Sequence, residues 1–272
     1  MVGKSNRHVQ RRKDVFTERQ ATKIWHEIPH PDNPYVATSS ICHGYDILEL
    51  MKKRNFVDTL FLLFNAKLPS KEQAELLDCL MIALINPGPR HPATRAAMNA
   101  GVGKTDSTHI LPISLGILSG SHLGAGEVEG SVRFIRKNIN KDPESIVESL
   151  LSNPQSLSEG DWHPVPGFGN RFSAVDEFSL QIARQLLTLE GAGKCLRWGN
   201  AFATALAQHQ MGWLTTGVAA ATFADLGFHP RYGAGLFQLL SAPGLLAHGV
   251  EMSTKPITAM PFLKDEDYII EK

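Results

Sequence analysis

Apolar residues recur at three- and four-residue steps over most of the chain from Asp46 onward. In the first such segment they are Ile47, Leu48, Leu50, Met51, Phe56, Val57, Leu60, Phe61 and Phe64. This spacing places apolar side chains on one face of a helix. Similar segments follow from Ser70 to Asn86 and at 93–103, 108–122, 125–138, 143–151, 175–190, 195–210, 212–226 and 232–250. Since no alternating run is long enough for a strand, the sequence predicts an all-α protein of about ten helices.

The breaks between these segments carry recognisable signals. Ser70, followed by Glu72 and Gln73, is typical of a helix cap and first turn. Residues 22–40 contain Pro29, Pro31 and Pro34 and are expected to be irregular. We also expect a polar arm at 1–20, a loop at 152–169 and an irregular tail at 251–272.

Composition excludes several classes of function. The 272 residues include 27 basic and 27 acidic side chains, so the formal net charge is zero. Such a chain has no basic field for nucleic acid or an anionic membrane. No apolar run approaches the roughly 20 residues of a membrane span, and residues 1–18 do not form a secretory signal. The cysteines Cys42, Cys79 and Cys195 are too widely spaced to indicate a disulfide framework or a zinc site. We therefore expect a cytoplasmic protein without a metal.

One short motif suggests nucleotide binding but is incomplete. Residues 101–105 read Gly-Val-Gly-Lys-Thr, the end of a phosphate-binding loop. The full pattern requires a glycine where Met98 stands, and a strand where 93–100 is predicted to be helical. An ATPase is therefore the weakest hypothesis for this chain.

Five segments, in order, resemble the citrate synthase superfamily. They are Ile-Cys-His-Gly-Tyr-Asp-Ile-Leu-Glu-Leu at 41–50 with a Leu-Pro turn at 68–69, Cys-Leu-Met to Pro-Gly-Pro at 79–89, the glycine-rich 120–127, Pro-Gly-Phe-Gly-Asn-Arg at 166–171, and 223–248. The second segment is most similar to citryl-CoA lyases and to the lyase module of ATP-citrate lyase.

The resemblance implies a fold, a reaction and an assembly. The fold would be a large helical domain formed by 1–88 and 188–272, interrupted by a small domain at 89–187, with the active site in the cleft between them. The chain would make or break a carbon–carbon bond next to a coenzyme A thioester, through an enolate. Its partners would be an acyl-CoA and a keto or hydroxy acid, and it would form a homodimer or a higher homo-oligomer.

The resemblance also implies site residues. Asp176 stands near the family's catalytic aspartate, although capping the following helix is an alternative role that it could also fill. Pro87 replaces a catalytic histidine and has no donor, so Asn86 and His91 are the catalytic candidates nearby. Substrate-binding candidates are Arg90, His122, Asn170 and Arg171, and coenzyme A would contact Gly124, Gly126, Gly167, Phe168 and Gly169.

Two further differences from the family pattern leave open whether the chain is catalytically active. Leu123 stands where citrate synthases have a histidine, as in the lyase module, and Ser241 stands where the family has a carboxylate-binding arginine. A dry cleft that binds several carboxylates needs a partner for each charge. The alternative hypothesis is therefore a catalytically altered protein that binds coenzyme A or a partner chain without the standard reaction.

Overall fold

The structure, a computed structural model, describes residues 19–152 and 163–271. Its contacts separate a unit that ends at Asn55 from a larger unit that begins at Phe56. Most of the expected polar arm at 1–20, and residues 153–162 of the expected loop at 152–169, lie outside the described residues.

The first unit contains a β-hairpin where the sequence predicted irregular chain. Strand β1 (Trp25–His30) pairs antiparallel with β2 (Asn33–Cys42), and β2 pairs with β3 (Tyr45–Asp46). The prediction was wrong because every residue of β1 is exposed, so no buried face imposes an alternating pattern. The register shifts around Pro29, and an edge strand such as β1 tolerates proline at such an irregularity. Between β2 and β3, His43 and Gly44 both have positive φ, the backbone of a type I′ turn.

The described residues contain eleven α-helices. They are α1 (Ile47–Lys53), α2 (Phe56–Asn65), α3 (Lys71–Leu84), α4 (Pro92–Val102), α5 (Ile110–Leu118), α6 (Gly126–Asn138), α7 (Pro143–Leu151), α8 (Glu177–Leu187), α9 (Lys194–Leu206), α10 (Thr215–Asp225) and α11 (Gly233–Ser253). The all-α prediction is thus confirmed. Ser70 caps α3 through the amide of Gln73, and the Gln73 side chain accepts from Ser70 in return.

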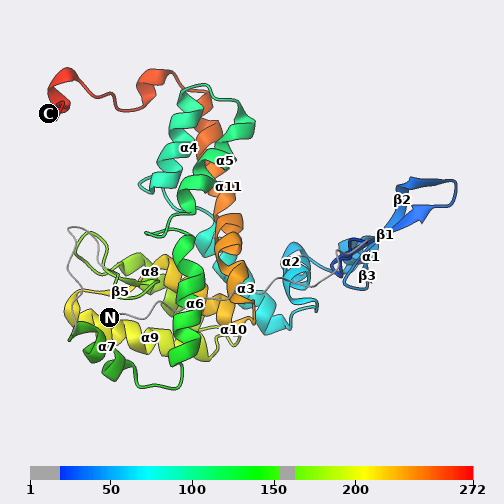
Figure 1. Ribbon diagram of the computed structural model, residues 1–272, viewed down its shortest axis with the longest axis horizontal. Helices are drawn as coiled ribbons and strands as arrows, with labels where there is room; N and C mark the ends of the chain where they lie inside the picture. Colours follow the sequence, from blue (N-terminus) through cyan, green and yellow to red (C-terminus); the bar gives the residue numbers. More distant parts are fainter. Residues whose placement is uncertain (1–18, 153–162, 272) are drawn as a thin grey trace, which may run out of the picture. The chain divides into compact units, whose positions relative to one another are not determined.

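Within the larger unit, α4 and α5 pack against α11, the long helix near the C-terminal end (Figure 1). Glycines allow the closest approach of these helices. A Cβ atom at Gly101 in α4 would lie 2.0 Å from the carbonyl oxygen of Gly249 in α11. The predicted small domain at 89–187 includes α4 and α5, and its boundaries remain a prediction.

Helices α6, α7, α8 and α9 gather around one another and α10 (Figure 1). Their shared core is aromatic, and the short strand β4 (Phe168–Gly169) pairs there with β5 (Gly212–Trp213). The Phe168 and Trp213 rings stack 4.5 Å apart, and Phe202 of α9 meets the Phe168 ring edge-on. This core fixes the segment leading from β4 to Arg171.

The Gly-Lys-Thr sequence at 103–105 forms the C-terminal turn of α4. The ammonium group of Lys104 donates to the carbonyls of Ser253 and Lys255 at the end of α11, at 2.7 and 2.6 Å. A lysine at that place satisfies orphan carbonyls of the helix, so a structural role accounts for it. No helix among the described residues is long and apolar enough to cross a membrane.

Candidate active site

A cavity of about 70 Å³ lies where the ends of several helices of the larger unit meet. Its described polar lining comes from chain segments far apart in sequence, and the remaining walls are mostly apolar. The polar residues are Asn86, His91, Arg171, Asp176, Thr215, Thr216 and Ser241. Polar groups that converge on a cavity with otherwise apolar walls are typical of the lining of a ligand site.

Asp176 caps helix α8 and also lines this cavity. It is the N-cap of α8, and its Oδ1 atom accepts from the amide of Ser179 at 3.1 Å. Its side chain is only 9% exposed, and Oδ2 lies 3.5 Å from Nη1 of Arg171. The cap orients the carboxylate, while the second oxygen remains turned toward Arg171.

Arg171 is held by a tight turn. Its backbone exchanges two hydrogen bonds with Ala174, and the residues between them, Phe172 and Ser173, both have positive φ. That conformation costs energy for residues other than glycine, and such strain is concentrated at functional sites. The guanidinium also lies 5.8 Å from the centre of the exposed Phe172 ring.

A second, more open cavity of about 550 Å³ adjoins the first. Both are lined by Pro87, Arg171 and Asp176, and Arg90 lines the outer cavity. The ion pair of Arg171 and Asp176 therefore lies where the two cavities meet. A ligand entering the inner cavity from the outer one would pass this pair.

His91 lines the inner cavity, but the fold uses both of its ring nitrogens. Nδ1 accepts from the amide of Ala93 at 3.1 Å as the N-cap of α4, and Nε2 lies 3.0 Å from the carbonyl oxygen of Leu123. Since Nδ1 accepts, Nε2 carries the proton and donates it. Burial lowers the pKa of His91, the hydrogen bond to Leu123 raises it, and the charge of Arg171 lowers it. The net effect is a lowered pKa and a neutral ring.

Asn86 keeps one donor for a ligand. Its Oδ1 atom accepts from the amide of Gly88 at 2.8 Å, and its Nδ2 atom lies 3.1 Å from Nε2 of His248 in α11. An amide nitrogen has two hydrogens, so the second can serve a ligand in the cavity that Asn86 lines.

The glycine-rich segment between α5 and α6 bonds mainly to itself. The amides of Ala125 and Gly126 donate to the carbonyls of Leu118 and Gly120. A Cβ atom at Gly124 would lie 2.5 Å from the Gly120 carbonyl oxygen, so this glycine allows a tight backbone turn. His122 stands on the exposed side of the segment and does not line either cavity.

The Gly-Phe-Gly segment is likewise packed into the protein. Gly167 has a φ of +83°, and a Cβ atom there would lie 2.6 Å from the Cα atom of Gly217 in α10. Phe168 and Gly169 are buried, whereas Asn170 is half-buried. The structure thus gives the first three residues a packing role, and contact with coenzyme A remains a prediction for them.

The structure brings together Asn86, His91, Arg171 and Asp176, and it adds Thr215 and Thr216 at the start of α10. Thr215 shares a hydrogen bond of 2.8 Å with Ser179, beside the cap of α8. Thr216 donates to Glu127. No motif identified these threonines, because their place in the cavity depends on how α10 packs.

Comparisons with known proteins identify the fold. No protein-family model matches the sequence, and no curated protein matches it by sequence. The citryl-CoA lyase of Hydrogenobacter thermophilus superposes with a TM-score of 0.75 at 22% identity, over 93% of this chain and 94% of that one. The ATP citrate lyase of Methanosaeta concilii, solved with (3S)-citryl-CoA, gives 0.69 at 16% identity, over 94% of this chain and 43% of that one.

Citrate synthase itself is also similar. The Thermoplasma acidophilum enzyme, solved with carboxymethyl coenzyme A and oxaloacetate, gives a TM-score of 0.58 at 16% identity. The match covers 80% of this chain and 57% of that one. The predicted resemblance is therefore confirmed at the level of structure: the chain has the all-α fold of the citrate synthase superfamily.

Proposed function

We propose that this protein makes or breaks a carbon–carbon bond next to a coenzyme A thioester, with Asp176 as the base. The observation that carries the proposal is the position of the Asp176 carboxylate, which is shared by the inner and outer cavities and faces Arg171. The comparison proteins solved with citryl-CoA, or with a coenzyme A analogue and oxaloacetate, support it.

The chemistry follows from the two oxygens of Asp176. Oδ1 is anchored on the amide of Ser179, and Oδ2 accepts the proton from the α-carbon of the acyl group. The electron pair moves onto the thioester oxygen, and the resulting enolate carbon attacks the carbonyl of the keto acid. The alkoxide formed in that attack takes up the proton held by Asp176. In the lyase direction Asp176 accepts the hydroxyl proton of the adduct, the carbon–carbon bond breaks, and Asp176 returns that proton to the enolate carbon.

Arg171 has a separate role in this scheme. Its guanidinium lies next to Oδ2 of Asp176. A carboxylate of the acid would compete for Arg171 through paired, charge-assisted hydrogen bonds. Binding of the acid then frees Oδ2 for the α-proton.

Asn86 is our candidate donor to the enolate oxygen. Its second amide hydrogen is available on the cavity wall, in the region where Pro87 offers none. His91 contributes by holding Leu123 and by keeping this part of the wall neutral, since both its nitrogens are engaged.

The lining also indicates the kind of acid. Arg171 is the cation among the described residues of the inner cavity, and Arg90 lies on the outer one. Because each unpaired buried carboxylate costs several kcal/mol, we propose a keto acid that is less anionic than oxaloacetate. The acyl-CoA would occupy the outer cavity, with Arg90 near it.

An apolar surface supports a homodimer. Phe56, Ile82, Ile85, Leu239 and Leu246 are exposed and line a groove of about 560 Å³. A contiguous exposed apolar patch marks an interface, and light scattering at micromolar concentration measures the oligomeric state.

Free cysteines at 42, 79 and 195 fit the reducing cytoplasm.

The alternative, a protein that binds coenzyme A without reaction, is favoured by Pro87 and Ser241 in the cavity wall. Uptake of deuterium from heavy water into the acyl group of acetyl-CoA and propionyl-CoA separates the two. We expect uptake with the wild type and its loss, by at least a thousandfold, in Asp176→Asn.

The matched control is Asp142→Asn, because Asp142 caps α7 as Asp176 caps α8. It should exchange like the wild type. Coenzyme A binding without exchange by the wild type would support the alternative, and equal exchange by Asp176→Asn would exclude Asp176 as the base.

A further inference from the structure

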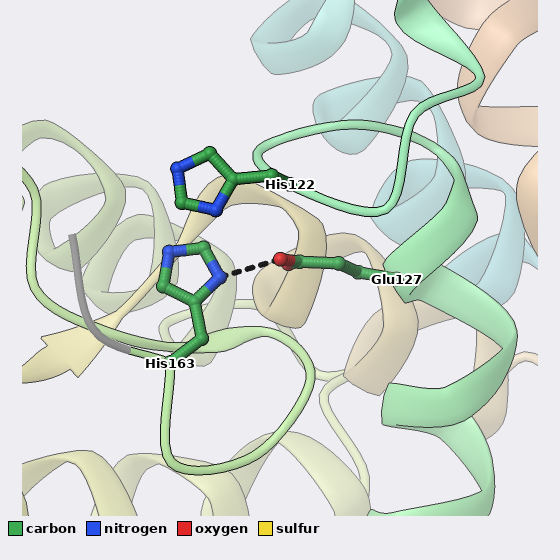
Figure 2. Close-up of side chains that lie close together, drawn as sticks. All are labelled: His122, Glu127 and His163. Atoms are coloured by element: carbon green, nitrogen blue, oxygen red, sulfur yellow. Dashed lines mark hydrogen bonds and ion pairs between the residues drawn. The ribbon is translucent and has the colours of Figure 1, made fainter. Parts of the chain in front are cut away.

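Outside the cavities, two histidines and a buried glutamate converge. His122 lies on the segment between α5 and α6, Glu127 in the first turn of α6, and His163 at the start of the segment that leads to β4 (Figure 2). One ligand atom of each side chain lies within 4.8 Å of the others. This set contains none of the three cysteines of the chain.

The carboxylate of Glu127 is unusual because it is buried. Its side chain is 4% exposed, and among the described residues its ion-pair partner is His163, with 2.5 Å between Oε1 and Nδ1. A buried carboxylate needs a compensating positive charge. A divalent cation would supply that charge permanently.

The second oxygen of Glu127 is already fixed by the fold. Oε2 accepts from the hydroxyl of Thr216 at 2.8 Å and from the amide of Gly167 at 3.3 Å. Partners of this kind orient a metal-binding carboxylate. They leave Oε1 directed toward the two histidines, as Figure 2 shows.

The two imidazoles complete the set. The ring of His163 is mostly buried, and its Nε2 atom has no hydrogen-bond partner among the described residues. The exposed His122 ring stacks on it, with ring centres 4.6 Å apart. A buried ring nitrogen without a partner is costly, and metal coordination would fix the orientation of such a ring.

We propose that His122, Glu127 and His163 form a binding site for one divalent transition-metal ion of the zinc type. Zinc accepts imidazole nitrogen and carboxylate oxygen at about 2.0–2.2 Å, and two histidines with one glutamate are a known zinc donor set. Ligand atoms around such an ion lie within about 4.2 Å of one another, so small rotations of these side chains would bring the three donors onto one ion. The ion would enter between Oε1 of Glu127 and Nδ1 of His163 and replace their direct contact.

The site lies directly behind the wall of the inner cavity. His122 precedes Leu123, and Glu127 bonds Thr216, and both Leu123 and Thr216 line that cavity. A bound ion would tie the 119–125 segment to the segment that enters Gly167. The site nevertheless involves no residue that the proposed reaction uses directly.

Metal binding can be tested without coenzyme A. Untagged full-length protein is stripped with a chelator and titrated with Co²⁺, whose visible absorption reports coordination, followed by displacement with Zn²⁺. We expect one equivalent per chain, at least tenfold weaker binding in His122→Ala, and at least hundredfold weaker binding in His163→Ala and Glu127→Gln. The exposed His209→Ala variant should bind like the wild type.

No saturable binding by the wild type, or equal binding by all the variants, would overturn the proposal. If Glu127→Gln fails to fold, the His122→Ala variant decides between the outcomes, because the His122 side chain is exposed. Failure of the metal site would leave the proposed reaction standing, since the deuterium experiment uses neither histidine.

Discussion

The carboxylate of Asp176 makes two contacts at once: Oδ1 caps α8 at the amide of Ser179, and Oδ2 lies 3.5 Å from Nη1 of Arg171. The first contact fixes the position of the side chain, and the second leaves one oxygen facing a cation that a substrate can remove. A capping role and a catalytic role are therefore compatible in this residue.

Replacement of Arg171 should weaken binding of the acid more than binding of the acyl-CoA. An interaction between charged hydrogen-bonding groups contributes about 1.5–3 kcal/mol, so Arg171→Ala should raise the KM for the acid by roughly 10- to 100-fold. Arg90→Ala, on the outer cavity, should affect the acyl-CoA instead. Equal effects of both variants on both substrates would contradict these separate roles.

The crossing of α4 and α11 should not tolerate a methyl group. Gly101→Ala places a Cβ atom 2.0 Å from a backbone oxygen of Gly249, and overpacking of this kind costs about 1–3 kcal/mol or more. A Cβ atom at Gly116 in α5 would meet nothing within 4 Å. Gly116→Ala should therefore stabilise the protein by about 0.5–1 kcal/mol. Urea unfolding of both variants measures the contrast, and equal stabilities would contradict the close crossing.

His91 should make the stability of the protein depend on pH. Its folded-state pKa is lowered from 6.5, chiefly by burial, so below that pH the unfolded state binds more protons. The contribution is present above about pH 6.5 and is lost as the pH falls toward the folded-state pKa. His91→Asn keeps a capping side chain without a titrating ring. Between pH 7.5 and 5.5 the wild type should lose more free energy of unfolding than this variant, and an equal loss would contradict the assignment.

Cys195 should be inert toward alkylation. Burial, followed by the charge of Asp225, raises its pKa to about 12. At pH 8 about one thiol in ten thousand is then ionised, and the thiolate is the reactive form. Iodoacetamide followed by mass spectrometry should modify the partly exposed Cys79 first and leave Cys195 unmodified until urea is added. Early labelling of Cys195 in the native protein would contradict its burial.

Local signals predicted most of the helices and part of the site. The Ser70 cap, the end of α3 before Pro87 and the limits of α6 could be inferred because each depends on neighbouring residues. The hairpin formed by β1 and β2 could not, since β1 and the first six residues of β2 are exposed and carry no apolar alternation.

Long-range contacts explain what the sequence did not show. Two side-chain contacts depend on how helices distant in sequence pack. They are the contact of Glu127 with Thr216 and that of Asn86 with His248. Likewise, the glycines at 124 and 167 fit both a ligand-binding loop and a tight backbone contact. Their surroundings show the tight backbone contact, and contact with coenzyme A stays a prediction for both.

In a crystal structure with acetyl-CoA and a keto acid, the distance from the thioester α-carbon to Oδ2 of Asp176 would show whether Asp176 can act as the base. We expect about 3–3.5 Å, the separation of reacting atoms in a productive complex, with Arg171 moved from Asp176 onto the carboxylate of the acid. A thioester bound elsewhere, with the ion pair of Arg171 and Asp176 unchanged, would contradict the account.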